Sequence, residues 1–137
     1  SIFDFDARIQ EFADAIGVAC DEMTRQTVLA CFRGVREETP VDTGFHRANW
    51  QIEAGTMNRD TIPLNSSPAA QQTKVMTHPS PSGRVWWIFN NGPAIKRLEY
   101  GWSKKKPNGM VRVTIANVLG RLEEIKRAAV RAAGLGR

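Results

Sequence analysis

The sequence predicts an α+β fold, in which a small antiparallel sheet is packed by a long N-terminal helix and a C-terminal helix, with a short helix between them. A helical apolar stripe at each end and two strand-like stretches in the middle support this prediction. A chain of 137 residues with 42% hydrophobic and 24% charged residues is typical of an ordered globular protein. We therefore expect one domain, residues 1–137.

The first long helix is predicted from about Asp6 to Glu38. Its stripe steps by three or four residues through Phe5, Ile9, Phe12, Ile16, Ala19, Met23, Thr27, Ala30 and Gly34. Asp4 and Asp6 are N-cap candidates, and Pro40 favours an end near residue 39. Such a helix is about 50 Å long. Because that is long for a small domain, we expect part of its stripe to meet another chain.

The next segment alternates as a half-buried strand does, with Ala48, Trp50, Ile52 and Ala54 on its apolar face. A turn is expected at 55–60. Residues 66–76 are ambiguous, although Ser67 as a cap and Pro68 in the first turn favour a short helix. Residues 77–83 form an expected loop.

Residues 84–90, with the sequence RVWWIFN, are the most strand-like stretch. Apolar residues point both ways, so both faces are expected to be covered. A turn at Asn91-Gly92 and a short helix from Pro93 to Tyr100 follow, with Ile95 and Leu98 directed inward and Gly101 past its end. Residues 102–109 are then a loop that contains the lysines.

The C-terminal helix is predicted from about Ile115. Its stripe is Val111, Ile115, Val118, Leu122, Ile125, Ala129 and Ala132. Whether residues 110–114 are strand or helix stays open, because Val111 and Val113 also alternate with Ile115 as in a strand.

Cysteine usage and charge restrict the function. Cys20 and Cys31 lie about 16 Å apart on one helix, too far for a disulfide, so buried free thiols are expected. The balance of 19 basic and 14 acidic residues gives +5. Its one basic run, Lys104 to Lys106, reads either as a solvated loop or as a contact with phosphates or an acidic partner. Neither a secretory signal nor a membrane-spanning run is recognisable, so we expect a cytoplasmic origin.

The tripeptide Asp42-Thr43-Gly44 also occurs as the catalytic signature of aspartic proteases. Here it follows the charged end of a helix and Pro40 rather than a buried strand, which argues against a peptidase. Asp, Thr and Gly are also suited to a tight corner, because Asp and Thr bond nearby amides and Gly tolerates positive φ. We interpret Pro40, Asp42, Thr43 and Gly44 as a structural corner. No other arrangement of serine, cysteine, histidine or acidic residues predicts a catalytic, metal or cofactor site, so the chain is expected not to be an enzyme.

Two stretches of the sequence resemble motifs of a known protein family. ETPVDTGFHRANW, followed about forty residues later by FNNGPAIKRLEYGWSKKKPNGMVRVTIANV, resembles the tail-completion, or head–tail joining, proteins of long-tailed bacteriophages, a group that includes lambda-like minor tail protein Z relatives. The resemblance covers nearly the whole chain in order. One departure is Ala94-Ile95, where family members often carry Tyr-Ala after the proline; we expect it to alter packing rather than role.

The resemblance implies a structural virion protein of the phage neck, assembled in the host cytoplasm, without catalytic residues or cofactors. It implies a homo-oligomeric ring, expected to be sixfold, that contacts the tail tube or tail terminator and the head connector, with non-specific DNA contact in the channel left open. Candidate interface residues are Trp50, Glu99, Tyr100, Trp102, Lys104, Lys105 and Lys106. The alternative is a small basic nucleic-acid-binding protein, favoured by the charge and by the lysine run beside Trp102.

Overall fold

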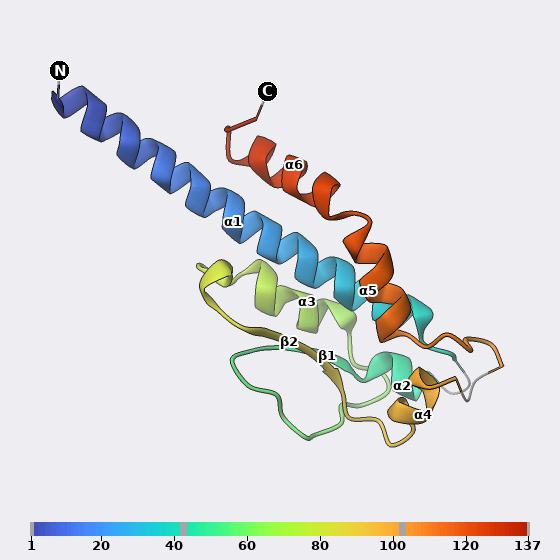
Figure 1. Ribbon diagram of the computed structural model, residues 1–137. Helices are drawn as coiled ribbons and strands as arrows, with labels where there is room; N and C mark the ends of the chain where they lie inside the picture. The colour runs from blue at the N-terminus through green and yellow to red at the C-terminus, as the bar shows by residue number, and fades with distance from the viewer. Residues whose placement is uncertain (1, 42–43, 102–103, 137) are drawn as a thin grey trace.

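The computed structural model describes residues 2–41, 44–101 and 104–136. It confirms the α+β class. In chain order the elements are α1 (Ile2–Glu38), α2 (Phe45–Ala48), β1 (Trp50–Ala54), α3 (Pro68–Met76), the 3-10 turn η1 (Pro81–Gly83), β2 (Trp86–Asn90), α4 (Ile95–Glu99), α5 (Val111–Leu119) and α6 (Leu122–Ala132). Figure 1 shows α1 as the long axis of the molecule, with its N-terminal end extending beyond the other elements.

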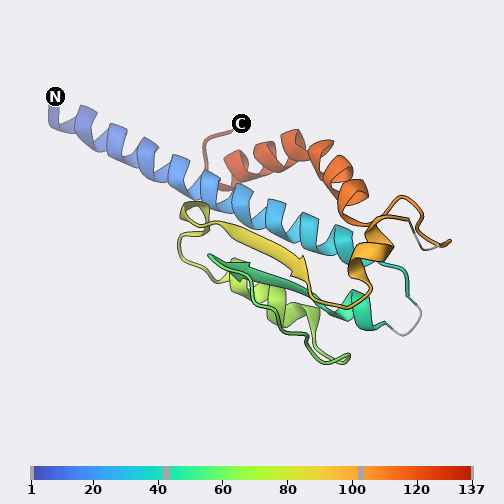
Figure 2. The same ribbon diagram turned by 60° about the horizontal axis from the view of Figure 1, so that its bottom comes forward.

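Helix α1 lies between two layers, with the sheet and α3 on one side and α5 and α6 on the other (Figure 2). The core cluster consists of Val28, Leu29, Phe32 and Val35 of α1 with Trp50, Ile52, Val75 and Met110. The expectation that both terminal helices cover the sheet is therefore corrected for the C-terminal part. Helices α5 and α6 pack on the α1 surface away from the strands (Figure 2).

The two strands pair antiparallel, with Trp50 opposite Asn90 and Ile52 opposite Ile88. Helix α3 begins as expected, with the Ser67 hydroxyl accepting from the N–H of Ala69 and Pro68 at the first position. It lies along β1, where Gln71 Oε1 accepts from the N–H of Ile52 at 3.0 Å. This bond satisfies a backbone group at the edge of β1, because the sheet formed by the described residues has two strands.

The predicted alternation of β1 is only partly correct. Residue 48 belongs to α2, Ala54 is exposed, and Gln51 is buried although it was expected on the polar face. The loop at 55–66 covers that face, because Gln51 Nε2 donates to the carbonyl of Asp60 at 2.9 Å. Asn49 exchanges two hydrogen bonds with the backbone of Ile62. In β2, by contrast, Trp87 stays 38% exposed, so this strand is not fully covered as expected.

The C-terminal segment is two helices rather than one, with a break between Leu119 and Leu122. Residues 111–114 are helical, which decides the question left open by the sequence. Ile115 is exposed instead of buried, and Thr114 and Val118 face inward. The reason is the close approach of α5 to α1, where a Cβ at Gly34 would lie 2.6 Å from Cγ2 of Thr114.

Two expectations about α1 also change. The helix already includes Ile2, so Asp4 and Asp6 lie inside its first turns rather than at its cap. Both thiols are free, but Cys20 is exposed, whereas Cys31 is half-buried and burial raises its pKa. The expectation of two buried thiols is therefore wrong for Cys20.

Candidate interaction surfaces

Trp50 is part of the core and not of an exposed interface, which corrects the prediction. Its side chain is buried, and its Nε1–H donates to the Thr39 hydroxyl at 2.7 Å. That hydroxyl in turn donates to the carbonyl of Val35 at 2.5 Å. Trp50 therefore joins the start of β1 to the last turn of α1.

The described residues of the predicted corner lie in the connection between α1 and α2, which side-chain hydrogen bonds stabilise. Pro40 is buried and Gly44 has φ 83°, the left-handed region that favours glycine. Arg47 donates to the carbonyls of Glu37 and Thr39, which holds α2 against the end of α1. Asp42 and Thr43, the other two corner residues, lie outside the described residues.

Glu99 caps a helix that begins well after it in the chain. Its Oε1 accepts from the N–H groups of Met110 and Val111 at 2.8 and 2.7 Å, and its Oε2 pairs with Nε of Arg112 at 2.9 Å. Burial alone would raise the pKa of this carboxyl, but these donors together hold its pKa below the ordinary value. The Glu99 carboxylate is therefore bonded to groups of its own chain at the start of α5.

The turn and lysine loop after α4 contain both exposed and occupied side chains. Tyr100 is 73% exposed, with the Arg112 guanidinium 5.6 Å from its ring centre. Lys106 pairs with Glu38 at 3.2 Å, and Lys105 donates to the carbonyl of Val41 at 3.3 Å. Lys104 is exposed, and Trp102 lies outside the described residues. Tyr100 and Lys104 are therefore the described members of this set that are most available to a partner.

Residues 4–18 of α1, which we call the N-terminal arm, are exposed apart from the half-buried Ala15. Phe5, Ile9, Phe12 and Ile16 are 42–64% exposed although they continue the apolar stripe. Figure 1 shows why, because the arm runs past the rest of the molecule. Its charged residues are four acids (Asp4, Asp6, Glu11 and Asp14) and one base (Arg8), a balance of 1 − 4 = −3.

A groove that no sequence pattern predicted, which we call the arginine groove, is lined by Arg33, Arg36, Glu37 and Arg47 with Pro68 and Gln72 of α3. Its volume is about 220 Å³. Arg33 and Arg36 are one turn apart on α1, a spacing visible in the sequence, but only the corner brings Arg47 beside them.

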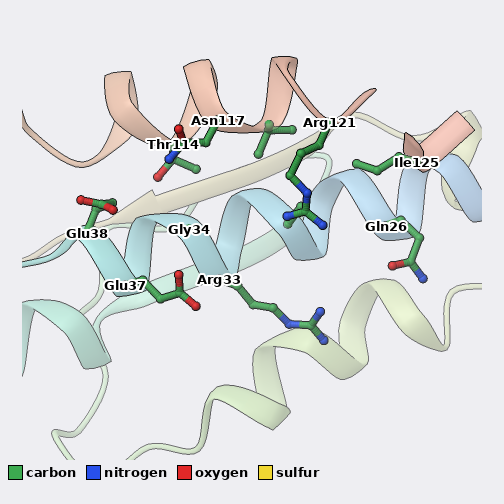
Figure 3. Close-up of a pocket in the computed structure, with 11 residues that line it drawn as sticks. Gln26, Arg33, Gly34, Glu37, Glu38, Thr114, Asn117, Arg121 and Ile125 are labelled. Atoms are coloured by element: carbon green, nitrogen blue, oxygen red, sulfur yellow. The ribbon is translucent and has the colours of Figure 1, made fainter. Parts of the chain in front are cut away.

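A second cavity of about 350 Å³ lies between α1 and the C-terminal helices. Figure 3 shows Arg33 and Glu37 directed away from Thr114 and Asn117 of α5.

Both histidines accept hydrogen bonds from backbone N–H groups. His46 Nε2 accepts from the N–H of Ala94 at 3.2 Å, and His78 Nδ1 accepts from the N–H of Ser80 at 3.0 Å.

Among residues 2–41, 44–101 and 104–136, no three His, Cys, Asp or Glu side chains gather as a metal site. In the same part of the chain, no helix has the length and hydropathy needed to cross a membrane.

Comparison of the chain with family models, curated proteins and solved structures gives no match.

Proposed function

We propose that this chain is a structural virion protein of the phage neck, where it joins the tail tube to the head connector as a non-enzymatic tail-completion protein. The motifs around residues 38–50 and 89–118 support the proposal through their resemblance to that group. The described geometry of both motifs is compatible with a structural role. Trp50 joins the start of β1 to the end of α1, and Glu99 caps the start of α5, so both side chains bind groups of their own chain.

The N-terminal arm is the observation that carries the proposal. An apolar stripe that its own domain leaves exposed is a common mark of a protein–protein contact. The arm projects from one end of the molecule (Figure 1), and a copy of the same chain that covers it with a different surface forms a head-to-tail contact. Such head-to-tail contacts close into rings when the rotation between subunits allows it. This is the assembly that a neck protein needs, with the arm as one of its two contact patches.

The second contact patch is assigned to the turn after α4, at Tyr100 and Lys104. These side chains are exposed, and Lys104 is suited to an acidic surface of a neighbouring subunit, the tail tube or the connector. The alternative function, nucleic-acid binding through the lysine run, has less support. Lys106 already pairs with Glu38, and Lys105 already contacts Val41, so less of their charge is available to phosphates.

The proposal is tested by placing charges on the arm. In an Ile9→Glu, Phe12→Glu variant the folded monomer should keep its melting temperature, because both side chains are exposed and outside the core cluster. The yield of joined, infectious particles in a complementation assay should fall. Met57→Glu, at an equally exposed apolar position in the loop at 55–66, is the matched control and should complement. Full complementation by the arm variant would contradict the proposal.

A further inference from the structure

The arginine groove contains more positive charge than the protein neutralises. Three guanidinium groups line it, from Arg33 and Arg36 of α1 and Arg47 of α2, and a single acid, Glu37, lines it with them. The formal balance is 3 − 1 = +2. None of the three arginines is within ion-pair distance of a carboxylate of the described residues. Glu37 therefore lowers the net positive charge of the groove but forms no ion pair with any of the three arginines.

Two of these guanidinium groups are held in place by the fold. Arg36 packs over the Phe32 ring at 5.7 Å and donates to the carbonyl of Arg47 at 3.3 Å. Arg47 is fixed by the carbonyls at the end of α1, as described above. Burial and the neighbouring charge of Arg47 lower the pKa of Arg36. Like charges are thus held together at a half-buried place, an arrangement that costs free energy unless an anion joins them.

Two of these arginines have hydrogen-bonding capacity that the described residues leave unused. Nε of Arg47 is buried and has no hydrogen-bond partner in the described part of the chain. Arg33 is exposed, and its side chain is engaged by none of the described residues. Pro68, at the first position of α3, brings the positive end of that nine-residue helix to the same groove.

We propose that the arginine groove is a binding site for a phosphate group. The formal balance of the groove is positive, and planar guanidinium groups bind phosphate oxygens through paired N–H donors. The volume of about 220 Å³ is several times the roughly 30 Å³ that one water occupies in the liquid, so a tetrahedral anion and a few waters fit. The phosphate comes either from the free ion or from a nucleic acid. This site is separate from the arm and the lysine loop, so it goes beyond the proposed function.

The test uses the full chain, titrated with inorganic phosphate in a calorimeter against sodium chloride at equal ionic strength. Phosphate should bind and chloride should not. Arg33→Gln should weaken binding by about three- to tenfold, the range expected for one charge-assisted contact at an exposed position. Glu37→Gln should tighten it by about twofold or more, since a nearby negative charge is removed. Neither side chain is in the core cluster, so both variants should fold.

Arg84→Gln is the matched control, because Arg84 is exposed and outside the groove. It should leave phosphate binding unchanged. A short DNA duplex forms the second arm of the experiment. Duplex binding that Arg33→Gln weakens and phosphate competes away would support the site and identify nucleic acid as the source. No phosphate binding, or equal effects of Arg33→Gln and Arg84→Gln, would overturn the inference. Because the purified protein is tested, either result is independent of complementation by the arm variant.

Discussion

The Glu99 carboxylate explains much of the second motif at the scale of single residues. Capping side chains normally lie next to the helix that they cap. Glu99 instead reaches the start of α5 because the chain turns back between them, with Gly101 and Gly109 at φ 90° and 83°. A Cβ at Gly109 would lie 2.7 Å from Oε2 of Glu99, so glycine is required there for space as well as for conformation. The motif is therefore a closed loop around one carboxylate.

Glu99→Gln should lower the free energy of unfolding by about 0.5–2 kcal/mol near neutral pH, the usual range for a lost cap. The pKa of Glu99 is lowered in the folded chain, so its contribution is fully present above the unfolded pKa of about 4.3. It is lost as pH falls through the folded pKa. Urea denaturation of both proteins from neutral to acidic pH measures this. The two stabilities should converge in acid, and a difference that stays constant with pH would contradict the assignment.

Helix α1 has two halves with different environments. The buried apolar residues of α1 lie between Ala19 and Val35, where the helix runs between the sheet and the C-terminal helices, whereas the N-terminal arm before them is exposed. The position of α5 depends on Gly34, because any side chain there would meet Thr114. The break between α5 and α6 then lets both helices follow α1 on the same side (Figure 2).

Gly34→Ala should destabilise the protein by about 1–3 kcal/mol, since the added methyl overlaps the Thr114 side chain and α5 must shift. Thr114→Ala removes both atoms nearest to that methyl and should relieve most of the loss in the double variant. The measurement is a double-mutant cycle of unfolding free energies. If the two effects simply add, α5 does not approach α1 at this point.

The whole molecule is asymmetric in shape and in charge. The N-terminal arm is acidic and lies at one end of α1, while α4 lies near the other end of that helix (Figure 1). The acidic arm and the exposed Lys104, which follows α4 in the chain, are complementary in charge, and such complementarity speeds up the encounter of two proteins. The same asymmetry would let the two ends of an assembled protein meet different partners.

Lys104→Glu should reduce the yield of joined, infectious particles and leave the melting temperature nearly unchanged, because this side chain is exposed. Reversal of all three lysines is a less specific test, since it also breaks the Lys106–Glu38 pair. Arg59→Glu, an equal charge change on the exposed loop at 55–66, is the control. Complementation by Lys104→Glu at the wild-type level would mean that the lysine loop is only a solvated surface.

The elements themselves could be predicted from the sequence because their causes are local. Periodicity predicted α1 and both strands, Ser67-Pro68 predicted α3, and Gly101 marked the end of α4. The exposed arm was also expected, because the length of a helix follows directly from its residue count. Each of these depends on neighbours within a few turns.

Only the tertiary structure decided which neighbours the side chains meet. It buried Trp50 against Thr39, covered Gln51 with a loop, and divided the C-terminal segment between Leu119 and Leu122. It also placed Glu99 at a later helix and brought Arg47 beside two arginines of α1. The physical reason is that these contacts join residues far apart in the chain. Periodicity shows that a face is apolar or polar, whereas the packing of the other elements determines what covers it.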